Sequence, residues 1–241
     1  MTTKQIAPRD LNWHPKPLTP DYRSSRLRAP THARLHYAPT ETERTGPTFG
    51  HETHGPNDSD LLTNYAAAGQ HAIGPRIIVY GRLTDENGRP LPGKLIEVWQ
   101  ANAGGRYRHK KDGYLAPLDP NFGGCGRSIT DAQGNYRFRT VQPGPFPWPN
   151  GGNDWRPAHI HFSVFGDGFA QRLITQMYFE GDPHIRLCPI VQAIPSEEAI
   201  NRLVARLDME RTVPMDTRAY RFDIVLRGHR QTPFENMLDG L

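Results

Sequence analysis

The chain has 241 residues, a length that one all-β domain can use in full, and a formal net charge of +4 with its 11 histidines counted as neutral. So small a charge, with no long run of Lys and Arg and no base-reading motif, argues against a nucleic-acid-binding protein. Glycine and proline, 23 of each, predict many turns, and an aromatic content of 10% argues against a disordered chain.

The composition also limits where the protein is expected to work. No apolar stretch approaches the ~20 residues of a membrane span, and the N-terminal segment lacks the apolar core of a signal peptide. The two cysteines, Cys125 and Cys188, are too few for a disulfide framework and are compatible with a reducing compartment. We therefore expect a cytoplasmic protein that makes no membrane contact.

Residues 1–75 are irregular in pattern and rich in proline, which disfavours helix at and just before each of its positions. Their aromatic residues are more frequent than in a free tail. We predict an arm that wraps another surface, with one short helix near residues 60–68. A folded domain, residues 76–241, is expected to begin where a run of β-branched and aromatic residues starts.

Six segments of this domain are rich in β-branched and aromatic residues, and we predict each of them to be a strand. Turn sequences separate several of them, and Asn87-Gly88 is one that adopts positive φ at low cost. No helical pattern follows each strand, so the expected fold class is all-β, an antiparallel β-sandwich. The predicted strands are residues 76–84, 94–101, 135–140, 158–165, 172–179 and 219–227.

One short helix is expected in the C-terminal half of the chain. Ser196 is a suitable N-cap residue, and Glu198 follows just beyond it. Apolar residues then recur at helical spacing, and these are Ile200, Leu203, Val204 and Leu207.

His159-Ile160-His161 is the sharpest local pattern. Side chains alternate between the two faces of a strand, so both imidazoles are expected on one face. Two imidazoles on one face can bind one metal ion. The competing interpretation is a pair of ordinary histidines, because the chain has 11 of them. Pro157, just upstream, stiffens the entry to this strand.

A tyrosine further upstream is a candidate third ligand. Two glycines, Gly104 and Gly105, bend the chain ahead of Tyr107 and expose it. A phenol with an ordinary pKa near ~10 is a poor ligand. A ferric ion stabilises the phenolate, however, and tyrosine ligates iron in some haem proteins. A packed turn aromatic is the alternative interpretation of Tyr107.

Longer motifs extend these short patterns over nearly the whole chain. They are Leu18–Tyr22, Gln100–His109, Leu115–Gly124, Asn153–Phe162, Gln176–Asp182 and Tyr220–Gly228. Together they resemble the β subunits of the protocatechuate 3,4-dioxygenases, in the family of intradiol ring-cleaving dioxygenases. The resemblance implies a non-haem Fe(III) enzyme on a β-sandwich of the eight-stranded type.

The resemblance implies the metal ligands one by one. The two histidine ligands of the family fall on His159 and His161, and one tyrosinate ligand falls on Tyr107. The second family tyrosinate belongs in a Gly-Pro-Tyr-Pro-Trp segment, which here has Phe146 in place of the tyrosine. Phenylalanine cannot bind iron, so we expect three protein ligands, with water or hydroxide filling the gap. Weaker iron retention and impaired activity are expected to follow.

The resemblance also implies the reaction, in which O₂ cleaves protocatechuate to 3-carboxy-cis,cis-muconate. Arg156 is expected to stabilise developing negative charge, with a structural salt bridge as the alternative. Gln176 is expected to orient the ring or O₂. Trp148 and Ile190 are expected to form apolar walls, and Tyr22 is expected to donate a hydrogen bond to the substrate carboxylate.

Family enzymes pair homologous α and β chains, and the αβ heterodimers assemble into larger oligomers. The resemblance therefore implies an α partner, which the arm of residues 1–75 would wrap. A catechol or hydroxyquinol 1,2-dioxygenase is one alternative, against which the proline-rich start argues, because those enzymes begin with a helical region. A catalytically weak structural subunit is a second, favoured by Phe146. A metal-free binding sandwich is a third, and it would make the histidine pair a coincidence.

Overall fold

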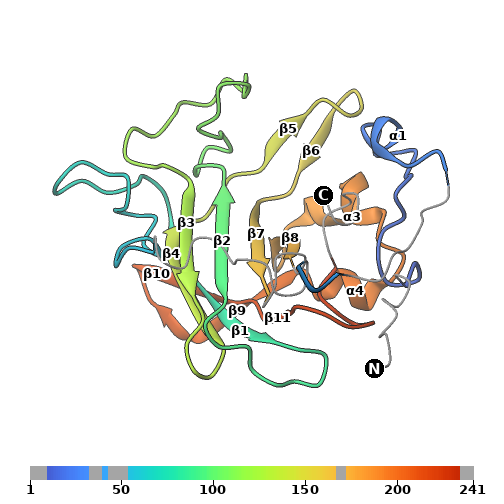
Figure 1. Cartoon of the computed structure of the whole chain (residues 1–241). Helices are drawn as coiled ribbons and strands as arrows, with labels where there is room; N and C mark the ends of the chain where they lie inside the picture. The colour runs from blue at the N-terminus through green and yellow to red at the C-terminus, as the bar shows by residue number, and fades with distance from the viewer. Residues whose placement is uncertain (1–9, 33–39, 43–53, 167–171, 234–241) are drawn as a thin grey trace.

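The structure is a computed structural model, and it describes residues 10–32, 40–42, 54–166 and 172–233 (Figure 1). Within these ranges the fold is mostly β, and the helices are short. No helix in the described ranges is both long enough and apolar enough to cross a membrane. The helices with described bounds are α1 (Ser25–Arg28), η1 (Pro183–Leu187), α3 (Pro189–Gln192) and α4 (Glu197–Asn201).

The strands of the described residues form one large mixed sheet and one small hairpin. The main sheet has the order β11-β1-β10-β9-β8-β7-β2-β3, with β4 also paired to β1, whereas β5 and β6 pair only with each other. The strands are β1 (Arg76–Thr84), β2 (Leu95–Gln100), β3 (Cys125–Ile129), β4 (Asn135–Val141), β5 (Phe146–Trp148), β6 (Asp154–Arg156), β7 (His159–Phe165), β8 (Arg172–Phe179), β9 (Val204–Val213), β10 (Thr217–Arg221) and β11 (Ile224–Val225).

Five of the six predicted strands are confirmed as β1, β2, β4, β7 and β8, with bounds that agree to within one residue. The sixth, 219–227, is split into β10 and β11, because the chain is irregular between them. There the carbonyl oxygen of Phe222 lies 1.8 Å from where a Cβ on Gly81 would be, so only glycine lets the chains approach this closely. Strands β3, β5, β6 and β9 were not predicted.

From the sequence we expected antiparallel pairing throughout, and the structure shows that this is wrong. The pairs β1–β10, β1–β11 and β8–β9 are parallel. Parallel neighbours need a long crossover, and the connection from β8 to β9 supplies one, since it contains η1, α3 and α4. Turn signals between successive strands therefore did not reveal which distant strands pair.

The predicted helix begins where expected but ends early. Ser196 caps α4, and its Oγ accepts a hydrogen bond from the backbone N of Ala199 at 3.3 Å. Val204 and Leu207, predicted as helical, lie in β9, which pairs with β8 on one side and β10 on the other. Pairing with two strands outweighs the helical spacing of these residues. The predicted helix at 60–68 is also wrong, because that segment forms turns.

A large buried cluster lies between the two ends of the sheet. The ring of Phe162 on β7 packs against Tyr136 and Phe138 on β4, with centroids 5.9 and 6.2 Å away. Two leucines from the arm, Leu61 and Leu62, belong to the same cluster. Strands that are distant within the sheet thus pack face to face, with side chains interdigitated between them.

A second buried cluster lies under the short helices. It contains Trp13 and Tyr22 from the arm together with residues of η1, α3 and α4, such as Ile190 and Ile200. Two described parts of the arm, residues 10–32 and 54–75, therefore pack on this chain's own domain (Figure 1).

Replacing Phe162 by alanine is expected to lower the free energy of unfolding by about 3–5 kcal/mol, since the side chain is fully buried at the centre of the larger cluster. Denaturant unfolding would measure the change. Leu27→Ala is the matched control, because Leu27 is 93% exposed, and its effect should stay within about 0.5 kcal/mol. Equal midpoints for the two variants would contradict this assignment of the core.

Candidate metal centre and its pocket

Strand register brings the two histidines and their neighbours onto one face of the sheet. On β7, His159 and His161 are separated by one residue, and their rings meet edge to face with centroids 4.8 Å apart. His161 is the register partner of Trp99 on β2 and of Gln176 on β8. Opposite residues in antiparallel strands point to the same face, so Trp99 and Gln176 flank His161 on this face of the sheet.

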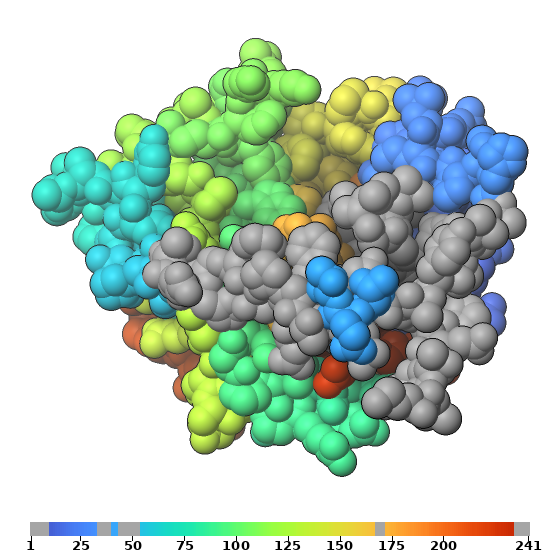
Figure 2. All heavy atoms as spheres, in the orientation of Figure 1, coloured from blue at the N-terminus to red at the C-terminus, as the bar shows by residue number. Residues whose placement is uncertain are grey.

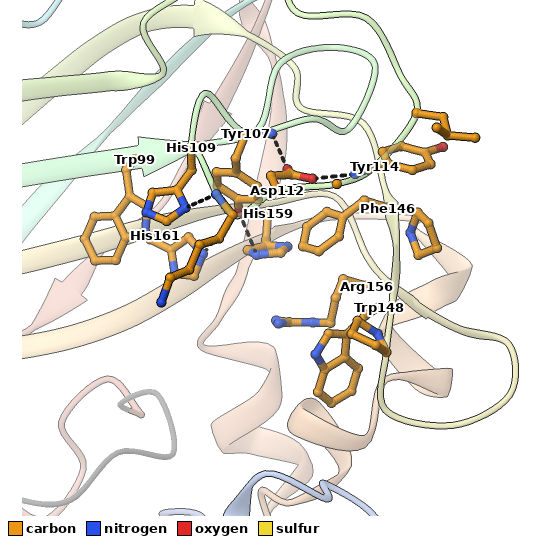
Figure 3. Close-up of a pocket in the computed structure, with 15 residues that line it drawn as sticks. Trp99, Tyr107, His109, Asp112, Tyr114, Phe146, Trp148, Arg156, His159 and His161 are labelled. Carbon is orange, nitrogen blue, oxygen red and sulfur yellow. Dashed lines mark hydrogen bonds between the residues drawn. The ribbon is translucent and has the colours of Figure 1, made fainter.

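A loop brings Tyr107 over the histidine pair. Gly105 has φ +83°, and a Cβ on it would lie 2.3 Å from the carbonyl oxygen of Pro145. Glycine therefore allows this loop to pack against the chain entering β5. The carboxylate of Asp112 then accepts hydrogen bonds from the backbone N of Tyr107 and of Tyr114, both at 2.8 Å, which closes the loop (Figure 3).

Three donor atoms converge at this point. The Oη of Tyr107 lies 3.3 Å from Nε2 of His159 and 3.2 Å from Nε2 of His161. A transition-metal ion with bonds of about 2.0–2.2 Å holds neighbouring ligands about 3 Å apart, so the observed spacing fits a shared ion. In the described ranges, no group of three His, Cys, Asp or Glu side chains could hold a metal. A site here therefore depends on the phenol.

His159 is prepared to act as a neutral ligand. Its Nδ1 lies 2.7 Å from the carbonyl oxygen of Pro157, to which Nδ1–H donates, leaving the lone pair of Nε2 facing Tyr107. Burial, reinforced by the nearby Arg156 and His161, holds the pKa of His159 well below its usual value, against the opposing hydrogen bond to Pro157. The ring is therefore uncharged at neutral pH, as a metal ligand must be.

Phe146 completes the wall beside these donors. Its ring centroid is 5.5 Å from that of Tyr107 and 5.5 Å from that of His159. On the β5–β6 hairpin it is the register partner of Arg156, so both side chains face the same way. Phe146, a residue without a donor atom, thus lies beside Tyr107 and His159.

The donors lie in a pocket of about 780 Å³. Figure 3 shows Trp99, Phe146 and Trp148 around it, with Arg156 pointing in from the hairpin. The rim carries polar and charged residues, and these are His109, Lys111, Asp112 and Tyr114. The pocket thus combines an apolar wall with a few polar groups, which is typical of small-molecule sites.

Arg156 is buried, and a hydrogen bond to Gln176 fixes its guanidinium. Its Nη2 donates to Oε1 of Gln176, and Oη of Tyr178 donates to the same oxygen at 2.9 Å. The guanidinium also lies 5.7 Å from the ring centroid of Trp148. Gln176 is not among the residues that line the pocket. The alternative for Arg156, a structural salt bridge, does not describe this contact, because the partner of Nη2 is a neutral amide.

Two predicted substrate-binding residues lie behind the pocket wall. Tyr22 is 8% exposed and packs edge to face on Trp148, with centroids 5.4 Å apart. Ile190 is buried in the second cluster, against which Trp148 also packs. Of the three predicted substrate contacts, Trp148 alone is among the residues that line the pocket.

The structure also shows site residues that the sequence analysis missed. Trp99 stacks on His161, with ring planes 3° apart and centroids 4.7 Å apart. The sequence placed Trp99 in the predicted strand 94–101, but only the pairing of β2 with β7 puts it opposite His161. Asp112 was missed because its role is to hold the loop backbone, which no local motif reveals.

Comparison with known proteins gives the family. The family described as "Dioxygenase" matches residues 44–228, more than half of the chain. A second, described as "Protocatechuate 3,4-dioxygenase beta subunit N terminal", matches residues 7–39.

The chain is 50% identical over 230 residues to the protocatechuate 3,4-dioxygenase beta chain of Burkholderia cepacia, and the aligned region covers 95% of this chain and 97% of that one. It is 38% identical over 116 residues to a chlorocatechol 1,2-dioxygenase of Pseudomonas sp. (strain P51), covering 44% of each. The structure of hydroxyquinol 1,2-dioxygenase from Pseudomonas putida DLL-E4 matches with a TM-score of 0.52 and 25% identity, covering 78% of this chain and 66% of that one. The chain therefore belongs to the intradiol dioxygenase family, to which protocatechuate 3,4-dioxygenase beta chains also belong.

Proposed function

We propose that this chain is the catalytic β subunit of a protocatechuate 3,4-dioxygenase, which uses O₂ to cleave protocatechuate to 3-carboxy-cis,cis-muconate. The observation that supports this most directly is the convergence of Tyr107, His159 and His161 in the pocket. Half of the residues are identical to those of a relative that carries this name.

The proposed cofactor is a non-haem Fe(III) ion held by Tyr107, His159 and His161. Two imidazoles and one phenolate suit a ferric ion, because the phenolate supplies negative charge to a hard cation. When bound there, the ion acts as a Lewis acid and a template for the two ring oxygens of a catechol. A water or hydroxide is proposed to take the ligand position that Phe146 cannot fill.

The proposed catalytic role of Arg156 is to stabilise negative charge that develops on the substrate. Its guanidinium enters a pocket with apolar walls, where a fixed cation interacts more strongly than it would in water. Gln176 is proposed to position Arg156, since it accepts the hydrogen bond of the guanidinium from outside the pocket. Trp99 and Trp148 exclude water from the reacting ring. Tyr22 and Ile190 support Trp148 from behind.

The loss of the second tyrosinate is proposed to lower activity. Phe146 removes an oxygen that could bind iron and take a proton from the substrate, and a positioned general base contributes about 10²–10⁴-fold. Hydroxide in its place can still act as a base, so turnover is expected to be reduced rather than abolished.

The proposed assembly is an αβ heterodimer within a larger oligomer in the cytoplasm. The division into an arm, residues 1–75, and a catalytic domain, residues 76–241, belongs to this proposal, with the arm contacting the α chain as well as its own domain. The proposed domain architecture is a β-sandwich of the intradiol type, which the face-to-face packing of β7 and β4 supports.

The test is oxygen uptake by the purified, iron-loaded protein with protocatechuate, catechol and hydroxyquinol. Consumption of O₂ with protocatechuate and formation of 3-carboxy-cis,cis-muconate are expected. Comparable turnover of catechol or hydroxyquinol would favour a 1,2-dioxygenase instead. Stoichiometric iron without protocatechuate-dependent uptake would favour a structural subunit, which Phe146 makes the second candidate.

Arg156→Gln is expected to reduce the turnover of protocatechuate by about 10²–10³-fold, the usual cost of removing a preorganised electrostatic partner of the transition state. Steady-state kinetics would measure the loss, and iron content should not change. Arg186→Gln is the matched control, since Arg186 is exposed and pairs with Glu197 outside the pocket. Equal turnover of the two variants would remove Arg156 from the mechanism.

A further inference from the structure

An asparagine outside the proposed metal site joins the arm to the β5–β6 hairpin. Asn150 is buried in the turn of this hairpin. Its Oδ1 accepts from the backbone N of Arg23 at 2.8 Å. Its Nδ2 donates to the backbone O of Asp21 at 2.7 Å and to Oδ2 of Asp154 at 2.8 Å. Both amide donors are thus used, and two of the three bonds reach the arm (Figure 2, where the blue arm lies beside the yellow hairpin).

The hairpin needs such support because it stands alone. β5 and β6 have three residues each and pair only with each other. An isolated two-stranded hairpin is marginally stable at best in water. Yet this hairpin carries Phe146, Trp148 and Arg156, which form one side of the pocket. Their position must therefore be fixed by contacts outside the hairpin.

The arm supplies a second set of contacts next to the amide. Tyr22 packs on Trp148, with ring centroids 5.4 Å apart. On the other side, the guanidinium of Arg28 lies 4.8 Å from the centroid of Tyr22. With Arg156 5.7 Å from Trp148, two aromatic rings in contact lie between a cation of the arm and a cation of the pocket. This row of contacts requires residues 21–28 to stay against the hairpin, and the hydrogen bonds of Asn150 hold residues 21 and 23 there.

We propose that Asn150 is a positioning residue that fastens the arm to the β5–β6 hairpin and thereby fixes Trp148 and Arg156 in the pocket. The fastening of the arm to the hairpin is inferred from contacts within this chain. The expected effect on the KM for protocatechuate rests on the proposed function.

Hydrogen exchange on the full-length protein without added metal tests the fastening of the arm to the hairpin. Asn150→Ala is expected to speed the exchange of the Arg23 amide and of the amides of β5 and β6 by about 10- to 100-fold, since three partly buried hydrogen bonds are lost. Exchange in β7 and β8 should not change. In the iron-loaded enzyme the KM for protocatechuate should rise, because Trp148 is no longer held.

Asn64→Ala is the matched control. Asn64 also joins the N-terminal region to the domain, with Nδ2 donating to the backbone O of Cys125 at 2.9 Å, so its partner is on β3 and not on the hairpin. It should leave hairpin exchange and KM unchanged. Should Asn150→Ala fail to fold, Asn150→Asp keeps Oδ1 as the acceptor for Arg23 but removes the two Nδ2 donors, and it should also speed exchange in β5 and β6.

Two outcomes would overturn the proposal. One is wild-type exchange in the arm and hairpin of both variants. The other is an increase spread evenly over the domain, which would make Asn150 a general packing residue. If the enzyme turns over no protocatechuate, the proposed function fails, while the exchange measurement still decides the role of Asn150.

Discussion

Phe146→Tyr is expected to raise the turnover of protocatechuate by about 10²–10⁴-fold, the contribution of a positioned general base. The ring at this position already lies 5.5 Å from the ring of Tyr107 and 5.5 Å from that of His159, centroid to centroid. A hydroxyl added to it would enter the same pocket as the three donor atoms. Iron retention should also improve, because a fourth protein ligand would join the three proposed ones.

Iron content, oxygen uptake and the visible absorption of the ferric protein would measure this gain. Phe146→Leu is the control, since it changes the ring without adding an oxygen, and it should gain neither iron nor turnover. A tyrosine variant with the iron content, turnover and absorption of the original chain would show that position 146 is not a ligand position. The proposed impairment would then be abandoned.

The local parts of this site could be predicted from the sequence. Strand alternation alone places His159 and His161 on one face, and the glycines ahead of Tyr107 indicate a sharply bent loop. What joins the loop to the strand is not local, because 52 residues separate Tyr107 from His159. Resemblance to known motifs, and not periodicity, linked these residues before the structure did.

The parts that were missed depend on which strands pair. Trp99 reaches His161 only because β2 pairs with β7. Likewise, Val204 and Leu207 follow helical spacing but become a strand between β8 and β10. In each case tertiary pairing decided the outcome, and no short window of sequence contains that information.

Tyr107→Phe is expected to remove most of the bound iron. Only His159 and His161 would remain as donors, and neither carries negative charge to offset a ferric ion. Loss of a supporting residue around a metal ligand already costs about 10–100-fold in affinity, so loss of the ligand itself should cost more. The colour that arises from phenolate bound to ferric iron should disappear with it.

Metal analysis and absorption after reconstitution with Fe(III) would measure the loss. Tyr114→Phe is the matched control, because Tyr114 lines the same pocket but its contact with Asp112 is made by its backbone N. Thermal unfolding of the metal-free variants should differ little, since phenylalanine preserves the ring at position 107. Full iron content and colour in Tyr107→Phe would contradict the proposed ligand set.

Combining the two substitutions separates the number of phenolates from their position. The original chain has one proposed phenolate ligand, Phe146→Tyr has two, Tyr107→Phe has none, and the double variant again has one, but at position 146. If only the number matters, the double variant should match the original chain in iron content. If position 107 matters, because Asp112 holds its loop and both imidazoles face its oxygen, the double variant should bind iron less well. We expect the second result, and such non-additivity is what residues that share one metal ion should show.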